Sequence, residues 1–131
     1  MTTRAAGTFD VTLTPQSSDA EPDGSTLARL AIDKTFRGDL DATSRGEMLS
    51  AATQTKGSAG YVAIERVTGA LHGRRGSFVL QHDGVMTRGA PALAVSVVPD
   101  SGTGELTGLA GTMRIIVERG RHAYEMDYTL D

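Results

Sequence analysis

The stretch at residues 60–86, GYVAIERVTGALHGRRGSFVLQHDGVM, decides the fold. It contains two strand-like runs, 61–71 and one that begins at Ser77, on either side of the turn-forming segment GRRG at 73–76. Apolar residues alternate with polar residues in both runs, which is typical of the strands of a half-buried β-hairpin. A loop of two or four residues would fix how the strands face each other. The stretch therefore predicts antiparallel β-structure at the centre of the chain.

The expected register of this hairpin places Leu71 opposite Phe78 and Val67 opposite His82. In that register the apolar side chains gather on one face and opposite charges pair on the other. Glu65 and His82 fall on the apolar face as diagonal neighbours. A carboxylate and an imidazole turned toward a core are the best candidates for chemistry in this chain.

Composition limits the class of protein. The chain has 131 residues, 13 basic and 16 acidic side chains, a formal charge of −3 and no cysteine. This length suits one domain, residues 1–131, and the charge argues against a nucleic-acid partner. Disulfides and thiolate chemistry are excluded. The sequence has no apolar leader and no apolar run of membrane-spanning length, so we expect a cytoplasmic protein without membrane contact.

Further strands are expected on both sides of the central hairpin. Residues 7–13 alternate cleanly, and 15–25 read as a mobile polar loop with two prolines. Residues 26–36 are compatible with a helical turn or a strand, and the strand is favoured because a Gly-Asp turn follows. Residues 40–52 alternate less strictly, with Gly46 as a bend. Residues 92–98 form a short apolar run.

The last hairpin has the clearest register. Residues 112–117 and 122–130 flank Gly120, and pairing them places Ile115 opposite Tyr124 and Met113 opposite Met126. With this hairpin the chain has about eight strands and no convincing amphipathic helix. We therefore predict an all-β fold, an eight-stranded antiparallel closed barrel, which either fills with side chains or holds one small ligand.

Four blocks of sequence resemble a bacterial family of small proteins, domain-of-unknown-function family 3224. The blocks are residues 32–40, 61–69, 76–82 and 104–111, and the resemblance extends over nearly the whole chain. It implies a barrel similar to that of allene oxide cyclase, which is also the scaffold of plant dirigent proteins. Those relatives bind hydrophobic small molecules and guide cyclisation or coupling, often as trimers. The plant cyclase's cysteine has no counterpart here, so no catalytic residue is carried over.

Glu65 and His82 form the sharpest hypothesis for a catalytic site. Burial would raise the pKa of the Glu65 carboxyl and make it a general base, with His82 sharing the proton. Alternatively, the two form a structural pair, or Glu65 pairs with Lys34 or an arginine. Aromatic and apolar residues on the same faces are the expected ligand contacts, with a tyrosine polarising an oxygen: Tyr61, Phe78, Leu80, Tyr124, Met126 and Tyr128. No cofactor and no metal site are predicted, because Asp33, Asp39 and Asp41 lack a converging histidine.

Three functions remain open from the sequence. The first is cofactor-free chemistry on a hydrophobic small molecule in the lumen, as an isomerase, a cyclase or a proton-transfer lyase. The second is a non-catalytic carrier or sensor that uses the same pocket, and the third is a structural oligomer with a filled barrel. Apolar residues that point away from the predicted core, among them Ile64, Val79 and Ile116, favour a homo-oligomer, either a dimer or a trimer.

Overall fold

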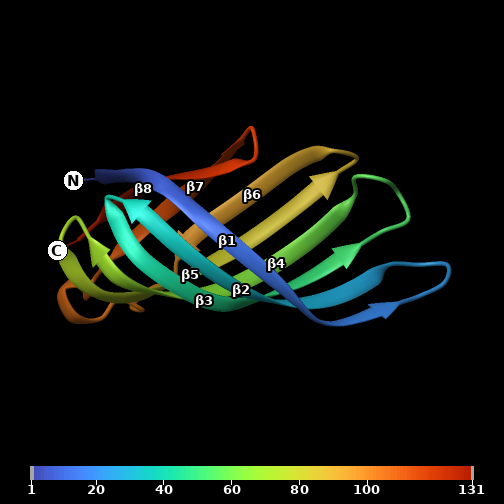
Figure 1. Ribbon diagram of the computed structural model, residues 1–131, viewed down its shortest axis with the longest axis horizontal. Helices are drawn as coiled ribbons and strands as arrows, with labels where there is room; N and C mark the ends of the chain where they lie inside the picture. The colour runs from blue at the N-terminus through green and yellow to red at the C-terminus, as the bar shows by residue number, and fades with distance from the viewer. Residues whose placement is uncertain (1, 131) are drawn as a thin grey trace.

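The computed structural model describes residues 2–130 as a closed barrel in which each strand pairs antiparallel with its neighbours in chain order (Figure 1). The elements are β1 (Thr3–Ala20), β2 (Thr26–Gly38), β3 (Leu40–Ala52), β4 (Ala59–Leu71), β5 (Arg74–Thr87), β6 (Ala90–Val97), the short 3-10 turn η1 (Gly104–Leu106), β7 (Ala110–Glu118) and β8 (Arg121–Thr129). The barrel closes where β8 pairs with β1. The predicted eight-stranded antiparallel barrel is therefore confirmed, and so is a strand at residues 26–36.

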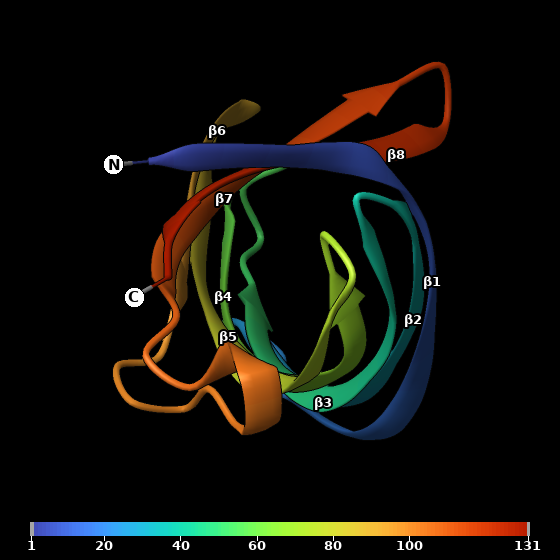
Figure 2. The same cartoon turned by 90° about the vertical axis from the view of Figure 1, so that its left-hand side faces the viewer.

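The core follows from the period-two alternation of the strands. In β4 the odd-numbered residues from Ala63 to Val67 are buried, whereas the even-numbered ones between them are exposed. The largest buried side chains include Phe36, Phe78 and Tyr124. Near η1, Leu106 and Leu109 complete this core, and η1 lies against β5 at one end of the barrel (Figure 2).

The two ends of the barrel differ in how completely the sheet closes. β1 pairs with β8 only over residues 3–9, and β6 pairs with β7 only through Val95 and Ser96. Beyond these contacts β1 to β6 remain paired as a sheet that extends past the β7–β8 hairpin (Figure 1). We call the end formed by this extended sheet the wide end, and we call the end at η1 the narrow end. The wide end has no strand joining β6 back to β1 within residues 2–130.

The register of the central hairpin differs from the expected one. The turn consists of His72 and Gly73, both with positive φ (46° and 81°), and the strands begin to pair at once between Leu71 and Arg74. Val67 therefore faces Phe78 rather than His82. Two residues with positive φ match the right-handed twist of the strands, so the tighter turn is favoured. The displacement is an even number of residues, so the inward and outward faces were predicted correctly.

The expected loop at residues 15–25 is shorter in the structure, because β1 continues to Ala20 and pairs with β2 as far as Thr26. Pro15 is accommodated at an irregularity in the register between Pro15 and Ser17. This part of β1 is an edge strand with β2 as its only neighbour among the described residues, and an edge tolerates a residue without an amide hydrogen.

The C-terminal hairpin has the predicted register. Ile115 lies opposite Tyr124 and Met113 opposite Met126, with the turn at Arg119 and Gly120. Over residues 2–130, no helix has the length and apolar character needed to cross a membrane.

Candidate functional site

Four consecutive strands each contribute one polar side chain to the inside of the barrel. Lys34 comes from β2, Ser44 from β3, Glu65 from β4 and His82 from β5. Lys34 and Ser44 are direct partners in the sheet, whereas Glu65 is one inward position further along and His82 one more. This diagonal brings all four head groups to one place. We call them the polar network.

Glu65 is the centre of the polar network and is completely buried. Its Oε2 accepts hydrogen bonds from Lys34 Nζ at 2.7 Å and from His82 Nε2 at 2.6 Å. Its Oε1 accepts a hydrogen bond from Ser44 Oγ at 2.7 Å. Both carboxylate oxygens are thus engaged, which is what a buried charge requires.

The glycine opposite Glu65 makes room for this arrangement. Gly46 of β3 pairs with Glu65, and a Cβ on Gly46 would lie 2.6 Å from Glu65 Cα and overlap the carbonyl oxygen of Ile64. The expected bend at Gly46 is therefore a close approach of two strands.

Lys34 is held by aromatic rings as well as by the carboxylate. Its Nζ lies 5.0 Å from the ring centre of Phe9 and 5.7 Å from that of Phe36. Ring faces attract a cation, so the ammonium group keeps favourable contacts on the side away from Glu65. Lys34 alternates with the buried residues Ile32 and Phe36, and this pattern in the sequence already indicated an inward lysine.

The pKa of Glu65 moves opposite to the expected direction. Burial acts to raise it, but the hydrogen bond from His82, the charge and hydrogen bond of Lys34 and the hydrogen bond from Ser44 outweigh burial and hold the pKa at about 2. A carboxylate with so low a pKa is a weak base. The structure therefore favours the alternative in which Glu65 forms a buried ion pair with Lys34 and a hydrogen bond with His82.

His82 keeps one nitrogen for other contacts. Because an ionised Glu65 can only accept, Nε2 of His82 carries a proton, and in the neutral imidazole Nδ1 has the lone pair. Nδ1 has no hydrogen-bond partner within residues 2–130, and no buried side-chain nitrogen or oxygen of those residues is left unsatisfied. Nδ1 is therefore not completely enclosed, although the His82 side chain is only 4% exposed.

Most of the expected ligand-binding residues lie in the packed core. Phe78, Leu80, Tyr124, Met126 and Tyr128 belong to the buried cluster. The Tyr124 hydroxyl donates to Arg37 O and accepts from Leu40 N, and the Tyr128 hydroxyl bonds to His72 Nδ1. Their polar groups are thus satisfied within the protein.

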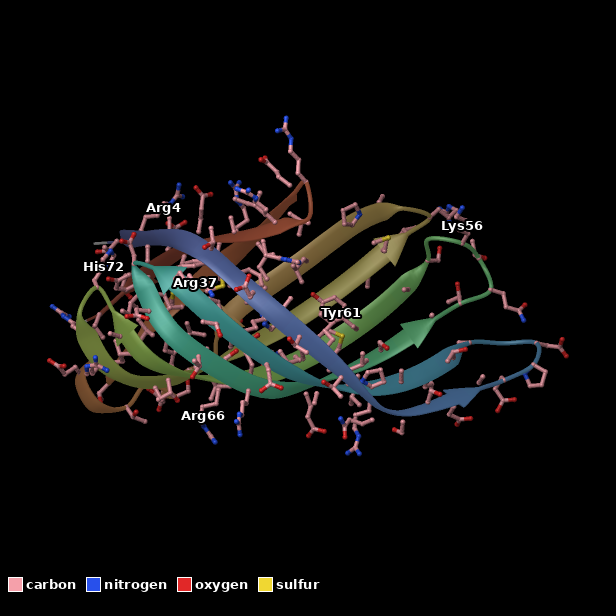
Figure 3. The ribbon with its side chains drawn as sticks, viewed as in Figure 1. Arg4, Arg37, Lys56, Tyr61, Arg66 and His72 are labelled. Carbon is pink, nitrogen blue, oxygen red and sulfur yellow. The ribbon has the colours of Figure 1, made fainter. Side chains whose placement is uncertain are left out.

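Tyr61 is placed differently from the other tyrosines. It lies nearer the wide end, whereas His72 is at the opposite end of the molecule (Figure 3). Its ring covers Gly84, where a Cβ would come 3.0 Å from Tyr61 Cζ. Burial and the nearby charge of Glu65 raise the pKa of the Tyr61 hydroxyl. Tyr61 is therefore neutral near pH 7 and able to donate a hydrogen bond.

Apolar side chains around Tyr61 line the inner face of the wide end and remain partly exposed. Leu13 and Leu93 are 43% exposed and Met86 is 42% exposed, although each occupies a position of its strand that faces the inside of the barrel. Half-buried residues complete this wide-end inner face: Leu30, Met48 and Tyr61. His82 lies in the next inward row, between Ala63 and Val95. The inner face of the wide end is thus apolar, and the polar side chain of His82 lies in the row next to it.

A family model described as a protein of unknown function (DUF3224) matches residues 5–128. The chain belongs to the DUF3224 family. A solved structure of a DUF3224 protein of unknown function from Shewanella oneidensis MR-1 is 57% identical, covers 100% of this chain and 98% of that chain, and has a TM-score of 0.95. Among curated proteins none matches the chain. The family resemblance is thus confirmed, whereas the likeness to allene oxide cyclase stays a prediction.

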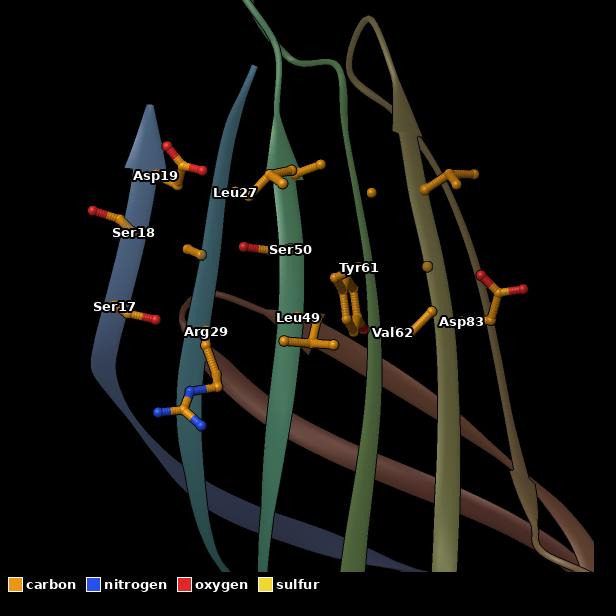
Figure 4. Close-up of a pocket in the computed structure, with 15 residues that line it drawn as sticks. Ser17, Ser18, Asp19, Leu27, Arg29, Leu49, Ser50, Tyr61, Val62 and Asp83 are labelled. Carbon is orange, nitrogen blue, oxygen red and sulfur yellow. The ribbon is translucent and has the colours of Figure 1, made fainter. Parts of the chain in front are cut away.

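A wide, open groove of this DUF3224 chain lies outside the barrel. It has a volume of about 710 Å³ and crosses the outer face of β1 to β5 at the wide end (Figure 4). The outward side chains Leu27, Leu49, Val62 and Val85 line it. The sequence analysis did not predict this groove. The signal for it was that Leu49 and Val62 are apolar residues at outward positions of alternating strands, where polar residues are expected.

In the described part of the chain, the polar network is not joined to a metal-binding cluster. Within residues 2–130, no group of three or more histidine, aspartate or glutamate side chains lies close enough together to hold a metal ion. Asp33 pairs with Arg45 at 3.5 Å, and Asp39 accepts a hydrogen bond from the amide of Ala6.

Proposed function

We propose that this protein binds an apolar small molecule at the wide end of the barrel and serves as a carrier or sensor. One observation carries the proposal: apolar residues on the inward phase of their strands, among them Leu13, Met86 and Leu93, remain about two-fifths exposed. The interior of a small barrel is normally filled with side chains, so that its inward residues are covered by their neighbours. An apolar inner surface that is left open is the kind of surface that takes a hydrophobic ligand.

Two polar groups would orient such a ligand. The Tyr61 hydroxyl can donate to a carbonyl or hydroxyl oxygen, and His82 Nδ1 can accept from a hydroxyl. The expected ligand is therefore a mostly apolar molecule with one oxygen function at its inner end. Glu65 contributes by fixing the orientation of the His82 ring, since its low pKa makes it unsuited to take a proton itself.

Binding can be tested with the apolar fluorescent probe 8-anilinonaphthalene-1-sulfonate. Leu93→Glu puts a charge on the wide-end inner face, whereas Leu49→Glu makes the same change on the outer face, at similar exposure (43% and 55%). We expect saturable probe fluorescence that Leu93→Glu weakens at least tenfold, because the charge would have to be desolvated. Leu49→Glu should bind as the native protein does.

Two results would refute the proposal. One is the absence of saturable binding to the native protein. The other is binding that Leu49→Glu abolishes and Leu93→Glu leaves intact, because the probe would then occupy the outer groove. Circular dichroism of both variants establishes that the barrel is folded in each case.

Proton transfer by His82 is the second candidate function, and one feature favours it. A carboxylate that bonds one imidazole nitrogen and leaves the other accessible is an arrangement that orients a general base. The test is exchange of the α-protons of 2-undecanone in D2O, followed by NMR. Catalysed exchange that His82→Gln abolishes would support proton transfer. Exchange no faster than that of the ketone without protein would rule out proton transfer and leave ligand binding as the proposed function.

A further inference from the structure

The outer face of the wide end carries a regular row of four side chains across four strands. Arg29 of β2 pairs with Leu49 of β3, Leu49 with Val62 of β4, and Val62 with Asp83 of β5. Figure 4 shows these residues side by side. The row therefore begins with a positive charge, crosses two apolar side chains and ends with a negative charge.

A second row extends the apolar surface toward the strand ends. It runs from Leu27 through Ala51 and Gly60 to Val85. On the other side of the first row, Ile64 is 49% exposed next to Glu47 and lines a second hollow of about 320 Å³ that shares Arg29, Leu49 and Val62 with the main groove. We call the two rows together with Ile64 the outer apolar face. A surface of this size with so many exposed aliphatic residues is typical of an interaction site.

We propose that a second copy of this chain docks on the outer apolar face, related by a two-fold axis that runs parallel to the strands between β3 and β4. Such an axis reverses the order of the strands and keeps the position along them. Arg29 then lies against Asp83 of the second copy, and Leu49 lies against Val62 of the second copy. In the second row Leu27 meets Val85. Opposite charges and apolar groups are matched at every position of the first row, as an isologous interface requires.

The charges at both ends of the row are available for this pairing. Asp83 takes part in none of the ion pairs within residues 2–130. Arg29 has one long contact, 3.5 Å to Glu47, between side chains that are both more than half exposed. Exposed pairs of this kind contribute little, so Arg29 can exchange Glu47 for the carboxylate of a second copy at small cost. A partner with a different charge pattern would not place opposite charges against both Arg29 and Asp83.

The area of the outer apolar face sets the expected strength of the dimer. Strands lie about 4.8 Å apart and rise about 3.3 Å per residue, so four strands over about five residues cover on the order of 300 Å² in projection. Standard interfaces bury about 800 Å² per partner, and the accessible surface exceeds the projected area because side chains protrude. We therefore expect a dimer with a dissociation constant in the micromolar range, independent of any lumen ligand.

Charge reversal provides the test. Sedimentation velocity over a range of protein concentrations should show a reversible monomer–dimer equilibrium for the native chain. Arg29→Glu and Asp83→Arg, each alone, should weaken the dimer about tenfold or more, because like charges would then face each other. The double variant carrying both changes should recover the native dissociation constant, since the pair is re-formed with its signs exchanged.

Arg66→Glu is the matched control. Arg66 is an exposed outward residue of β4, beyond Ile64 and outside the outer apolar face (Figure 3). The same change of charge there should leave the dissociation constant within twofold. A chain that stays monomeric at all concentrations, a trimer, or a dimer that survives Arg29→Glu unchanged would each overturn the proposal. A double variant that fails to regain dimerisation, although folded by circular dichroism, would overturn the two-fold geometry.

Discussion

The carboxylate of Glu65 and the ammonium group of Lys34 lie 2.7 Å apart inside the barrel wall, with side chains 0% and 6% exposed. Ser44, His82 and the rings of Phe9 and Phe36 provide the remaining contacts of this pair. Burying two charges costs several kcal/mol per ion, which the attraction offsets only when every polar atom is satisfied. The pair is therefore better understood as a structural anchor than as a reactive group.

Removing one member of the pair should destabilise the protein strongly. Glu65→Gln leaves Lys34 as an uncompensated buried charge, so we expect the free energy of unfolding to fall by roughly 3–5 kcal/mol, as measured by urea denaturation. The double variant Glu65→Gln with Lys34→Met removes both charges and should lose less than the sum of the single changes. As a control, Asp10→Asn breaks the exposed pair with Arg37 and should cost only ~0–1 kcal/mol. Additive losses at Glu65 and Lys34 would contradict a coupled pair.

The same carboxylate predicts how stability depends on pH. Its pKa is lowered from 4.5 to about 2 on folding, so the unfolded chain takes up the proton first as the pH falls. The stability that Glu65 contributes is fully present above pH 4.5 and is lost as the pH falls to about 2. The loss amounts to roughly 3 kcal/mol, at about 1.4 kcal/mol per pH unit. Urea midpoints at neutral and acidic pH measure it, and Glu65→Gln should remove this part of the acid sensitivity. An equally steep acid dependence in the variant would show that other carboxylates cause it.

Glycine 46 offers a test of the close approach between β3 and β4. In Gly46→Ala the new Cβ would lie 2.6 Å from Glu65 Cα, against backbone that cannot move aside freely. We expect a loss of roughly 1–3 kcal/mol, measured by thermal or urea unfolding. Gly60→Ala, in the next strand, is the control, because its nearest neighbours would be 3.8 Å and 3.9 Å away. That change should be neutral or stabilise by about 0.5 kcal/mol. Equal effects at both glycines would mean that the sheet relaxes around Gly46.

Much of the fold could be predicted from the sequence because alternation is a local property. The period of two in the strands assigned Glu65 and His82 to one face, and the register of the C-terminal hairpin followed from matching Met113 with Met126 and Ile115 with Tyr124. The strand at residues 26–36 was recognised from the same alternation. Each of these inferences uses residues that are close in the chain.

Other features depended on interactions that the alternation does not encode. The tight turn at His72 and Gly73 requires a positive φ at a histidine, and the segment richer in glycine and arginine beside it was the stronger turn signal. The low pKa of Glu65 follows from the hydrogen bond of His82 and from the diagonal approach of Lys34 and Ser44 across the sheet. An isolated buried carboxylate would instead have a raised pKa, which is what the sequence suggested.

By itself, the sequence determined the all-β class, the eight strands, the inward placement of Glu65 and His82 and the family. Only the tertiary structure decided which of those residues meet, that Lys34 compensates the charge of Glu65, and that the barrel stays open at one end with a second apolar face outside it. The physical reason is that side-chain phase is set residue by residue along a strand. Register, twist and closure instead depend on turn geometry and on contacts between strands that are distant in the chain.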